Sequence, residues 1–332
     1  MTSVALRQPG RAPRHLRGWR GVVAARLGQA LATAWIVATL CFIFVHMLPG
    51  DLALRIANGR VGEGNVTTDI TARIRNEERL DRPLVAQYTT WMAQLATGNF
   101  GQSLVTRRPV GETLWQYGRN TLTLGFLSWV LSYLIAIPIG VAAGFRPGGM
   151  VDRATLLIAV VFASLPTFMV GIGLIALFSL TLHWFPPAGF RTPAHMVLPV
   201  ATLALGLAAF SVRLIRNAVV DVRRAFFMTF AQIKGLDARQ AFAQHGIRNA
   251  LIPIVTFSAL QFAYIVDGFI MAETLFNYPG LGELLVNALL ARDVPLIMGA
   301  GLVIGLFYTL INLAADLGTL ALDPRRRQDG RW

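Results

Sequence analysis

Three carboxylates stand inside long apolar runs of this sequence, where acidic residues are rare and costly. Asp267 and Glu273 share one run, and Asp316 lies in the next. Placing an Asp at the centre of a membrane costs ~2.5–3.5 kcal/mol on the milder scales, and acids at that depth often face a water-filled path for ions or solutes. Together with the amide of Gln261, these acids are the candidate residues of a translocation pathway.

Two interpretations of Asp267 stay open. Its carboxylate either packs inside the bundle against a hydroxyl or backbone group, or lines a cavity and favours solutes that carry a positive group. On a helix, Glu273 would lie about 9 Å nearer the outer surface and about 120° around the axis, so the two acids need not share a face.

Other reaction chemistries are missing from the sequence. There is no G-x-x-x-x-G-K-[ST] phosphate loop, and the single lysine, Lys234, precedes a glycine instead of following one. The five histidines form no metal-ligand spacing, no G-x-S-x-G nucleophile motif occurs, and the G-x-G at 280–282 is typical of a turn. We therefore expect no catalytic residue, no metal site and no cofactor bound by this chain.

The composition places these residues in a membrane. Apolar residues make up 55% of the 332 positions and charged residues only 14%, against ~25% in an ordinary globular chain. The net charge is +13. Basic loops that face anionic lipid and the cytoplasm explain this charge better than nucleic-acid binding does. The single cysteine, Cys41, excludes an intrachain disulfide.

Six apolar stretches are long enough to cross a bilayer, which takes about 20 helical residues. They are 27–47, 120–145, 154–184, 196–212, 250–276 and 296–322. The first is longer than the roughly 7–15 apolar residues of a signal peptide, so we expect it to be retained. The third contains Pro166 and is expected to kink or tilt. The sequence predicts an all-α membrane protein with six transmembrane helices.

The distribution of arginines predicts the orientation of these spans. The segment 1–26 carries six arginines and no acid, the tail 323–332 carries four arginines against two acids, and the loop 213–249 has a net charge of +5. The loop 48–119 counts little, because loops longer than ~60 residues cross regardless of charge. Both termini and the loop 213–249 are therefore predicted to be cytoplasmic, and the loop 48–119 periplasmic.

The long loop 48–119 contains one segment with helical periodicity in otherwise polar surroundings. Its apolar positions are Leu84, Tyr88, Trp91, Met92 and Leu95. This spacing predicts a helix over residues 82–96.

The loop 213–249 is patterned as two short helices. Phe226, Phe230 and Ile233 recur at i, i+4 and i+7, which puts them on one helical face. Gly235 supplies a stop for the first helix, because glycine readily adopts the left-handed conformation that ends helices.

The second short helix begins with a capping-box pattern. Asp237 is followed three residues later by Gln240, and Gly246 is expected to close the helix. An exposed turn at residues 234–237 would join the two helices.

Two glycine pairs predict close helix contacts. Gly140 and Gly144, like Gly301 and Gly305, are separated by three residues, a spacing that lets two helices approach closely in a membrane.

Several ordered blocks of this sequence resemble one family, the oligopeptide/dipeptide/nickel permeases of binding-protein-dependent ABC importers, whose cytoplasmic "EAA" loop matches residues 231–236 and 245–253. Further blocks in the same order are 46–51, 80–84, 273–282, 292–295 and 322–325. Thr229 and Gln232 stand where the family usually has arginines, Asn99 where it often has Asp, and Asp267 where it has a small uncharged residue.

The resemblance implies a type I ABC importer permease in the bacterial cytoplasmic (inner) membrane, carrying peptides or, in some branches, nickel complexes. It implies four kinds of partner: a homologous second permease subunit, two ATPase subunits that use ATP and magnesium, an extracytoplasmic solute-binding protein, and the lipid bilayer. The helix expected over residues 82–96 would help dock that binding protein or cap the pathway. The residues that would couple the chain to the ATPase are Phe226, Phe227, Phe230, Lys234, Gly235 and Asp237.

An ion-coupled secondary transporter or channel is the alternative, since intramembrane acids often mark proton or ion relays. The patterned basic loop 213–249 has no obvious role in such a protein. An intramembrane enzyme is disfavoured, because no nucleophile–base or metal spacing is present.

Overall fold

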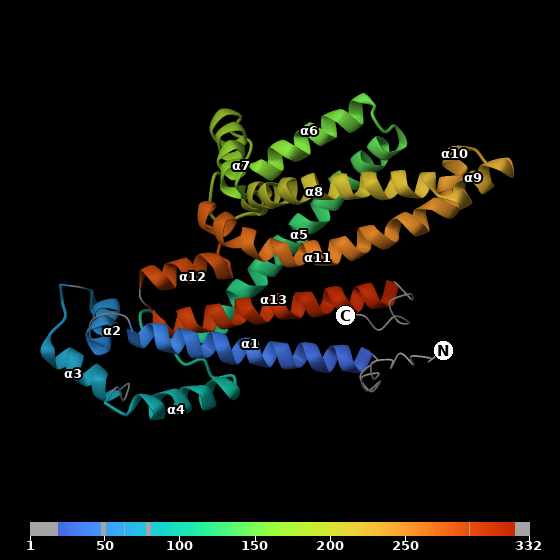
Figure 1. Cartoon of the computed structure of the whole chain (residues 1–332). Helices are drawn as coiled ribbons and strands as arrows, with labels where there is room; N and C mark the ends of the chain where they lie inside the picture. The colour runs from blue at the N-terminus through green and yellow to red at the C-terminus, as the bar shows by residue number, and fades with distance from the viewer. Residues whose placement is uncertain (1–18, 48–50, 63, 78–80, 292, 323–332) are drawn as a thin grey trace, which may run out of the picture.

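The computed structural model describes residues 19–47, 51–62, 64–77, 81–291 and 293–322, and this part of the chain is almost entirely helical (Figure 1). The outer parts of the predicted terminal segments, 1–18 and 323–332, lie outside the described residues. The helices are α1 (Trp19–Met47), α2 (Leu52–Val61), α3 (Thr68–Glu77), α4 (Leu84–Ala96), α5 (Val110–Phe145), α6 (Met150–Ser164), α7 (Thr167–Leu174), α8 (Val197–Arg224), α9 (Phe226–Ile233), α10 (Ala238–Ala241), α11 (Ile247–Leu275), α12 (Leu281–Leu290) and α13 (Val294–Leu322). The predicted all-α architecture is confirmed.

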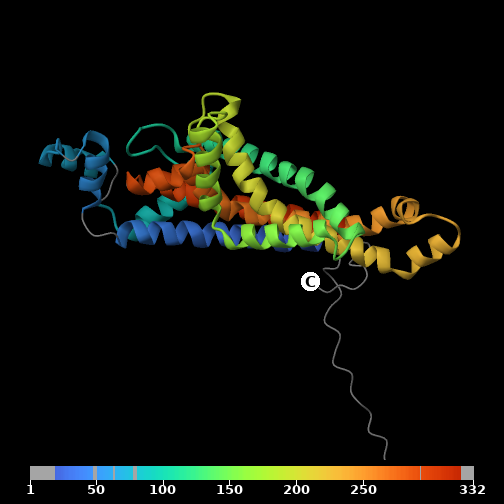
Figure 2. The ribbon, with the colours of Figure 1, turned by 90° about the horizontal axis from the view of Figure 1, so that it is seen from above.

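The long helices lie lengthwise in an elongated bundle (Figures 1 and 2). In Figure 1, α1, α13, α11 and α8 run roughly along one direction, and α5 crosses behind them. The start of α1 and the end of α13 lie at the same end of the bundle as α9 and α10, whereas α2, α3, α4 and α12 lie at the opposite end. This arrangement places α9 and α10 at the end of the bundle where α1 starts and α13 ends. The cytoplasmic orientation of this end stays a prediction.

Within the described residues, three helical segments are long and apolar enough to cross a membrane, or four if a bent pair counts as one span. The three are Val110–Phe145, Pro193–Arg224 and Val294–Ala314. The helices α1 and α11 are 29 residues long each. The count of six spans stays a prediction.

The bent pair is the predicted third span. The helices α6 and α7 meet at 106°, a far sharper break than the expected kink or tilt. The break lies at Leu165, whose backbone is extended, directly before Pro166. Proline disfavours a helical conformation in the preceding residue and cannot donate a backbone hydrogen bond, so the helix stops there.

Two of the observed helices are longer at one end than the spans predicted from the sequence. The helix α5 begins at Val110, before the apolar stretch 120–145, and α8 continues to Arg224, beyond the stretch 196–212. In α8 the apolar stripe runs on through Ile215 and Val219, which are buried, so tertiary packing sustains the helix among arginines.

Close helix contact is confirmed at one of the two predicted glycine pairs, Gly140 and Gly144. A Cβ atom built at Gly140 would lie 2.8 Å from Cβ of Ile215, and one at Gly144 would lie 2.7 Å from Cβ of Val219. Only glycine allows α5 and α8 to pack this closely. At the other pair, a Cβ atom at Gly305 would lie 3.8 Å from Cγ2 of Val37 in α1, an ordinary contact distance.

Candidate functional site

The helix α9 presents an exposed apolar surface at one end of the bundle. Its inner side is held by Met228 and Ala231, which are buried in a cluster that includes Phe242. On its outer side Phe226 is 83% exposed and Ile233 is 77% exposed. The exposed large side chains, called the α9 face below, are Phe226, Phe227, Phe230 and Ile233. The predicted helical face is thus present and is turned to solvent.

The turn after α9 has the predicted geometry. Gly235 has φ +99°, a left-handed conformation, and the Lys234 ammonium lies 4.6 Å from the centre of the Phe230 ring. The Asp237 carboxylate accepts a hydrogen bond from the Gln240 backbone N–H at 2.7 Å, and the Gln240 side chain accepts one from the Asp237 N–H at 3.3 Å. The capping box that opens the second short helix is confirmed.

The predicted helix end at Gly246 is wrong. The chain continues from α10 through a π-helical segment, Phe242–Gly246, directly into α11. Gly246 has φ −80° and ψ −44°, which is an ordinary helical conformation. A Cβ atom there would lie 2.4 Å from the Phe242 ring, so this glycine allows close packing instead of ending a helix.

Glu273 is fully buried at the opposite end of α11. Its carboxylate accepts hydrogen bonds from the Thr121 hydroxyl at 2.7 Å and from the backbone N–H groups of Gly282 at 2.7 Å and Glu283 at 3.3 Å. The two N–H groups belong to the first turn of α12, where a negative charge stabilises a helix. The carboxylate therefore ties α12 and α5 to the end of α11.

The segment between α11 and α12 closes tightly over this carboxylate. A Cβ atom at Gly280 would lie 2.1 Å from the Glu273 carboxylate. The hydroxyl of Tyr278 donates to the Asn120 backbone carbonyl at 3.1 Å, and burial together with the nearby Glu273 raises the pKa of Tyr278 to about 12. The phenol is therefore neutral at physiological pH.

Gln261 lies elsewhere on α11 and has different partners. Its carbonyl oxygen accepts hydrogen bonds from the hydroxyls of Tyr133 and Ser211, both at 2.9 Å, and its amide donates to the Leu207 carbonyl at 2.7 Å. It therefore joins α11 to α5 and α8, about 18 Å along the helix from Glu273 at 1.5 Å per residue.

Of the four pathway candidates, the two whose side chains are described, Gln261 and Glu273, do not lie together. Asp267 lies in α11 and Asp316 in α13, and their side chains are outside the described part of the structure. Among the described residues there is no group of three or more His, Cys, Asp or Glu side chains that could hold a metal ion.

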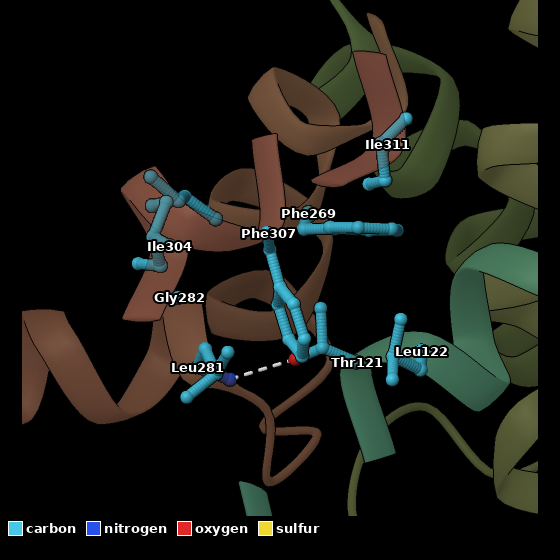
Figure 3. A pocket seen from close by; sticks show the side chains of 9 residues that line it. Thr121, Leu122, Phe269, Leu281, Gly282, Ile304, Phe307 and Ile311 are labelled. Carbon is cyan, nitrogen blue, oxygen red and sulfur yellow. Dashed lines mark hydrogen bonds between the residues drawn. The ribbon is translucent and has the colours of Figure 1, made fainter. Parts of the chain in front are cut away.

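A narrow apolar crevice opens between α5, α11, α12 and α13 (Figure 3). Its volume is about 20 Å³, which is room for about one water molecule. The Thr121 hydroxyl at its edge accepts a hydrogen bond from the Leu281 N–H at 2.8 Å, drawn as the dashed line. Labelled lining residues include Leu122, Phe269, Ile304, Phe307 and Ile311. This crevice is far too small to hold a peptide.

The helix predicted over residues 82–96 is present as α4 and packs against α1. The Tyr88 and Thr39 hydroxyls are 2.8 Å apart, and the Phe42 ring lies 5.2 Å from the Tyr88 ring and 5.9 Å from that of Trp91, between centroids. At the start of α4, Leu84 and Val85 are exposed. The helix therefore offers an apolar surface to a partner.

Two further buried carboxylates join parts of the chain that are distant in sequence. The sequence analysis did not identify them. Asp293 accepts hydrogen bonds from the Ser103 hydroxyl and from the Leu104 N–H at 3.2 Å, which joins the segment before α5 to the start of α13. Asp152 pairs with Arg216 of the basic loop. The available signal was position: each acid lies beside the start of an apolar run, next to a single arginine.

Comparisons with known proteins agree on one family. Residues 136–328 match the family model described as "Binding-protein-dependent transport system inner membrane component". The glutathione transport system permease protein GsiC of Salmonella choleraesuis (strain SC-B67) is 37% identical over 305 residues, covering 92% of this chain and 98% of that protein. GsiC of Escherichia coli (strain K12) shows the same identity and coverage.

A solved structure supports the fold. A chain from the inward-facing MetNI methionine ABC transporter superposes with a TM-score of 0.51 at 20% sequence identity, covering 64% of this chain and 96% of that chain. The likeness is to the fold of a type I importer permease.

Proposed function

The chain belongs to the family of binding-protein-dependent transport system inner membrane components, and we propose that it serves as one of two homologous permease subunits of an ATP-driven importer for peptide-like solutes. It is a translocation component of an ABC importer and not an enzyme. In this proposal, ATP and magnesium are used by two partner ATPase subunits, and a periplasmic binding protein delivers the solute.

The α9 face is the observation that carries the proposal. Three phenylalanines and an isoleucine stand exposed on a short helix that is fixed to the bundle from behind. Large apolar side chains grouped on a rigid element are typical of protein–protein interfaces. We propose that the ATPase docks here, with Lys234 and Asp237 at the edge of the contact and Gly235 forming the turn.

The substrate proposal follows the relatives. The GsiC proteins are named as glutathione permeases, and glutathione is a tripeptide. We propose peptides of similar size as the solutes, and nickel complexes as the second candidate. The crevice in Figure 3 is too small for such a solute, which supports a pathway completed by a second permease subunit.

The pathway residues divide into two pairs in this proposal. Glu273 and Gln261 have their acceptors occupied by neighbouring helices, and we assign them to holding the bundle. Asp267 and Asp316 remain the candidates for contact with solute. If Asp267 favours cationic groups, Asp267→Asn should weaken uptake of cationic peptides relative to neutral ones, whereas an equal loss for all solutes would leave it a structural residue.

The orientation is tested with a reporter fused after Trp332. A reporter that works only in the cytoplasm should be active, because the arginine-rich segments predict cytoplasmic termini. Activity of a periplasm-only reporter at the same position would contradict this topology.

The transport function is tested by reconstitution with the partner subunits in vesicles. Uptake of labelled glutathione should require ATP and the binding protein and should stop with vanadate. Phe226→Ser combined with Phe230→Ser should prevent ATPase binding, whereas Phe210→Ser, an exposed apolar residue in α8, should not. Uptake that survives ATP depletion on a proton gradient would support the ion-coupled alternative.

A further inference from the structure

Asp152, in the first turn of α6, accepts hydrogen bonds on both of its carboxylate oxygens. Arg216 of α8 donates from Nε to one oxygen at 2.9 Å and from Nη2 to the other at 2.6 Å. The Gly148 N–H donates to the second oxygen at 2.8 Å, and the Arg213 guanidinium lies 3.6 Å from the first. A two-pronged contact of this kind fixes orientation as well as distance.

The helix α6 is attached to the rest of the molecule by a narrow stripe. Its buried residues are Asp152, Thr155 and Ala159, spaced i, i+3 and i+7 on one side of the helix. The Thr155 hydroxyl donates to the carbonyl of Asp152 in its own helix, so it adds no link to α8. The other sides of α6 expose apolar residues such as Leu157. The two-pronged contact of Asp152 with Arg216 is therefore a directional connection between α6 and α8.

A second arginine of α8 fastens the same region to α5. Arg223, seven residues after Arg216, donates to the carbonyls of Gly144 at 3.2 Å and Phe145 at 2.6 Å, and its guanidinium lies 4.8 Å from the centre of the Phe145 ring. Between the two arginines Val219 packs against Gly144. The second half of α8 is thus fixed to the end of α5 and to the start of α6.

The α9 face is joined to the second half of α8 by a very short connection. The helix α8 ends at Arg224, α9 begins at Phe226, and Ala225 alone separates them. A displacement of the α9 face is therefore transmitted across one residue to the end of α8, the helix that carries Arg216 and its contact with Asp152 of α6.

We propose that Asp152 is a positioning residue of the transport cycle, and that its ion pair with Arg216 makes the bent pair α6–α7 move with α8 when a partner displaces the α9 face. The inference rests on the proposed function in one respect, namely that a partner ATPase acts on that face. Without the pair, α8 would still move, but α6 and α7 would follow it incompletely.

The first test compares variants that alter the contact without removing bulk. Asp152→Asn keeps the size and removes the charge, and Arg216→Lys keeps the charge and removes the two-pronged geometry. Asp69→Asn is the control, because Asp69 is an exposed carboxylate of α3, at the opposite end of the bundle from α9. ATP hydrolysis and solute uptake are measured in the same vesicles, with the complete importer.

Asp152→Asn and Arg216→Lys should lower the uptake per ATP at least tenfold while ATP hydrolysis falls less than twofold. The Asp69→Asn control should leave both unchanged. An unaltered uptake per ATP in the two variants would overturn the proposal. A parallel fall in assembled complex, hydrolysis and uptake would overturn it too, because the pair would then serve only to hold the fold.

A second measurement follows the motion of α6 relative to α8 and does not depend on transport. After replacement of Cys41 by serine, spin labels at Leu157 of α6 and Phe210 of α8, both exposed, report the distance between the two helices. In the unaltered background this distance should keep one narrow distribution with and without nucleotide, and Asp152→Asn should broaden it. An unchanged distribution in Asp152→Asn would overturn the inference. Absence of ATP-driven uptake by the unaltered protein would instead refute the proposed function.

Discussion

Glu273 of α11 accepts a 2.7 Å hydrogen bond from the Thr121 hydroxyl of α5, across 152 positions of sequence. The same hydroxyl accepts from the Leu281 N–H at 2.8 Å, so Thr121 connects the end of α11 to the first residue of α12. An acid that the sequence marks as a candidate for binding solute is, in the folded chain, fully occupied in joining three helices.

Replacing Glu273 with alanine should destabilise the protein. The buried Thr121 hydroxyl and the Gly282 N–H would both lose their acceptor, at a cost of ~1–3 kcal/mol for each unsatisfied group. The melting temperature of the purified protein and the yield of folded protein should both fall. Thr274→Ala, next in sequence and exposed, is the control and should change neither. Lost uptake with an unchanged melting temperature would instead indicate that Glu273 acts in the pathway.

Gly144→Ala should loosen the contact between α5 and α8. The new methyl group would lie 2.7 Å from Cβ of Val219 and 3.0 Å from the Arg216 carbonyl oxygen, and overpacking of this kind costs ~1–3 kcal/mol. Gly206→Ala in α8 is the matched control, because no atom lies within 4 Å of the position where its Cβ would be. That control should be neutral or stabilising by up to ~1 kcal/mol. Equal melting temperatures for the two variants would contradict the close contact.

Gly235→Asp should abolish uptake and uncouple ATP hydrolysis while the protein still inserts normally. A Cβ atom there would meet nothing within 4 Å, so the effect comes from the φ of +99°, which costs an L-residue ~1–3 kcal/mol, and from a new charge beside the α9 face. Uptake and ATP hydrolysis are measured together.

Gly62→Asp is the control for backbone strain alone. Gly62 also has a positive φ, +84°, with open space around it. It directly follows α2, which lies at the opposite end of the bundle from α9. Coupled turnover should survive in this variant. If both variants behave alike, the turn at Gly235 has no special part in coupling.

The exposed residues at the start of α4 should contribute to docking the binding protein. Leu84→Asp combined with Val85→Asp places charges on side chains that are 58% and 74% exposed, so stability should be unaffected. Affinity for the solute-loaded binding protein should fall about tenfold, or ~1.4 kcal/mol. Thr89→Asp adds a charge to an exposed position of the same helix and should have a smaller effect.

Deleting residues 84–96 is the harsher version of this experiment. In protein that still inserts normally, unchanged uptake after the deletion would show that α4 has no role in delivery or in capping the pathway.

Local pattern alone was enough for several features. The composition and the apolar stretches predict a helical membrane protein, and the face shared by Phe226, Phe230 and Ile233 and the capping box at Asp237 appear in the structure as expected. These features depend on residues three to seven positions apart, so the sequence determines them directly through helical geometry.

Features that depend on a distant partner were decided only by the tertiary structure. The sequence shows that Glu273, Asp293 and Asp152 are acids beside apolar runs, but their partners lie 152, 190 and 64 positions away, respectively. A buried carboxylate takes its role from the donors that the fold brings to it, and those donors cannot be read from the carboxylate's own neighbours in sequence.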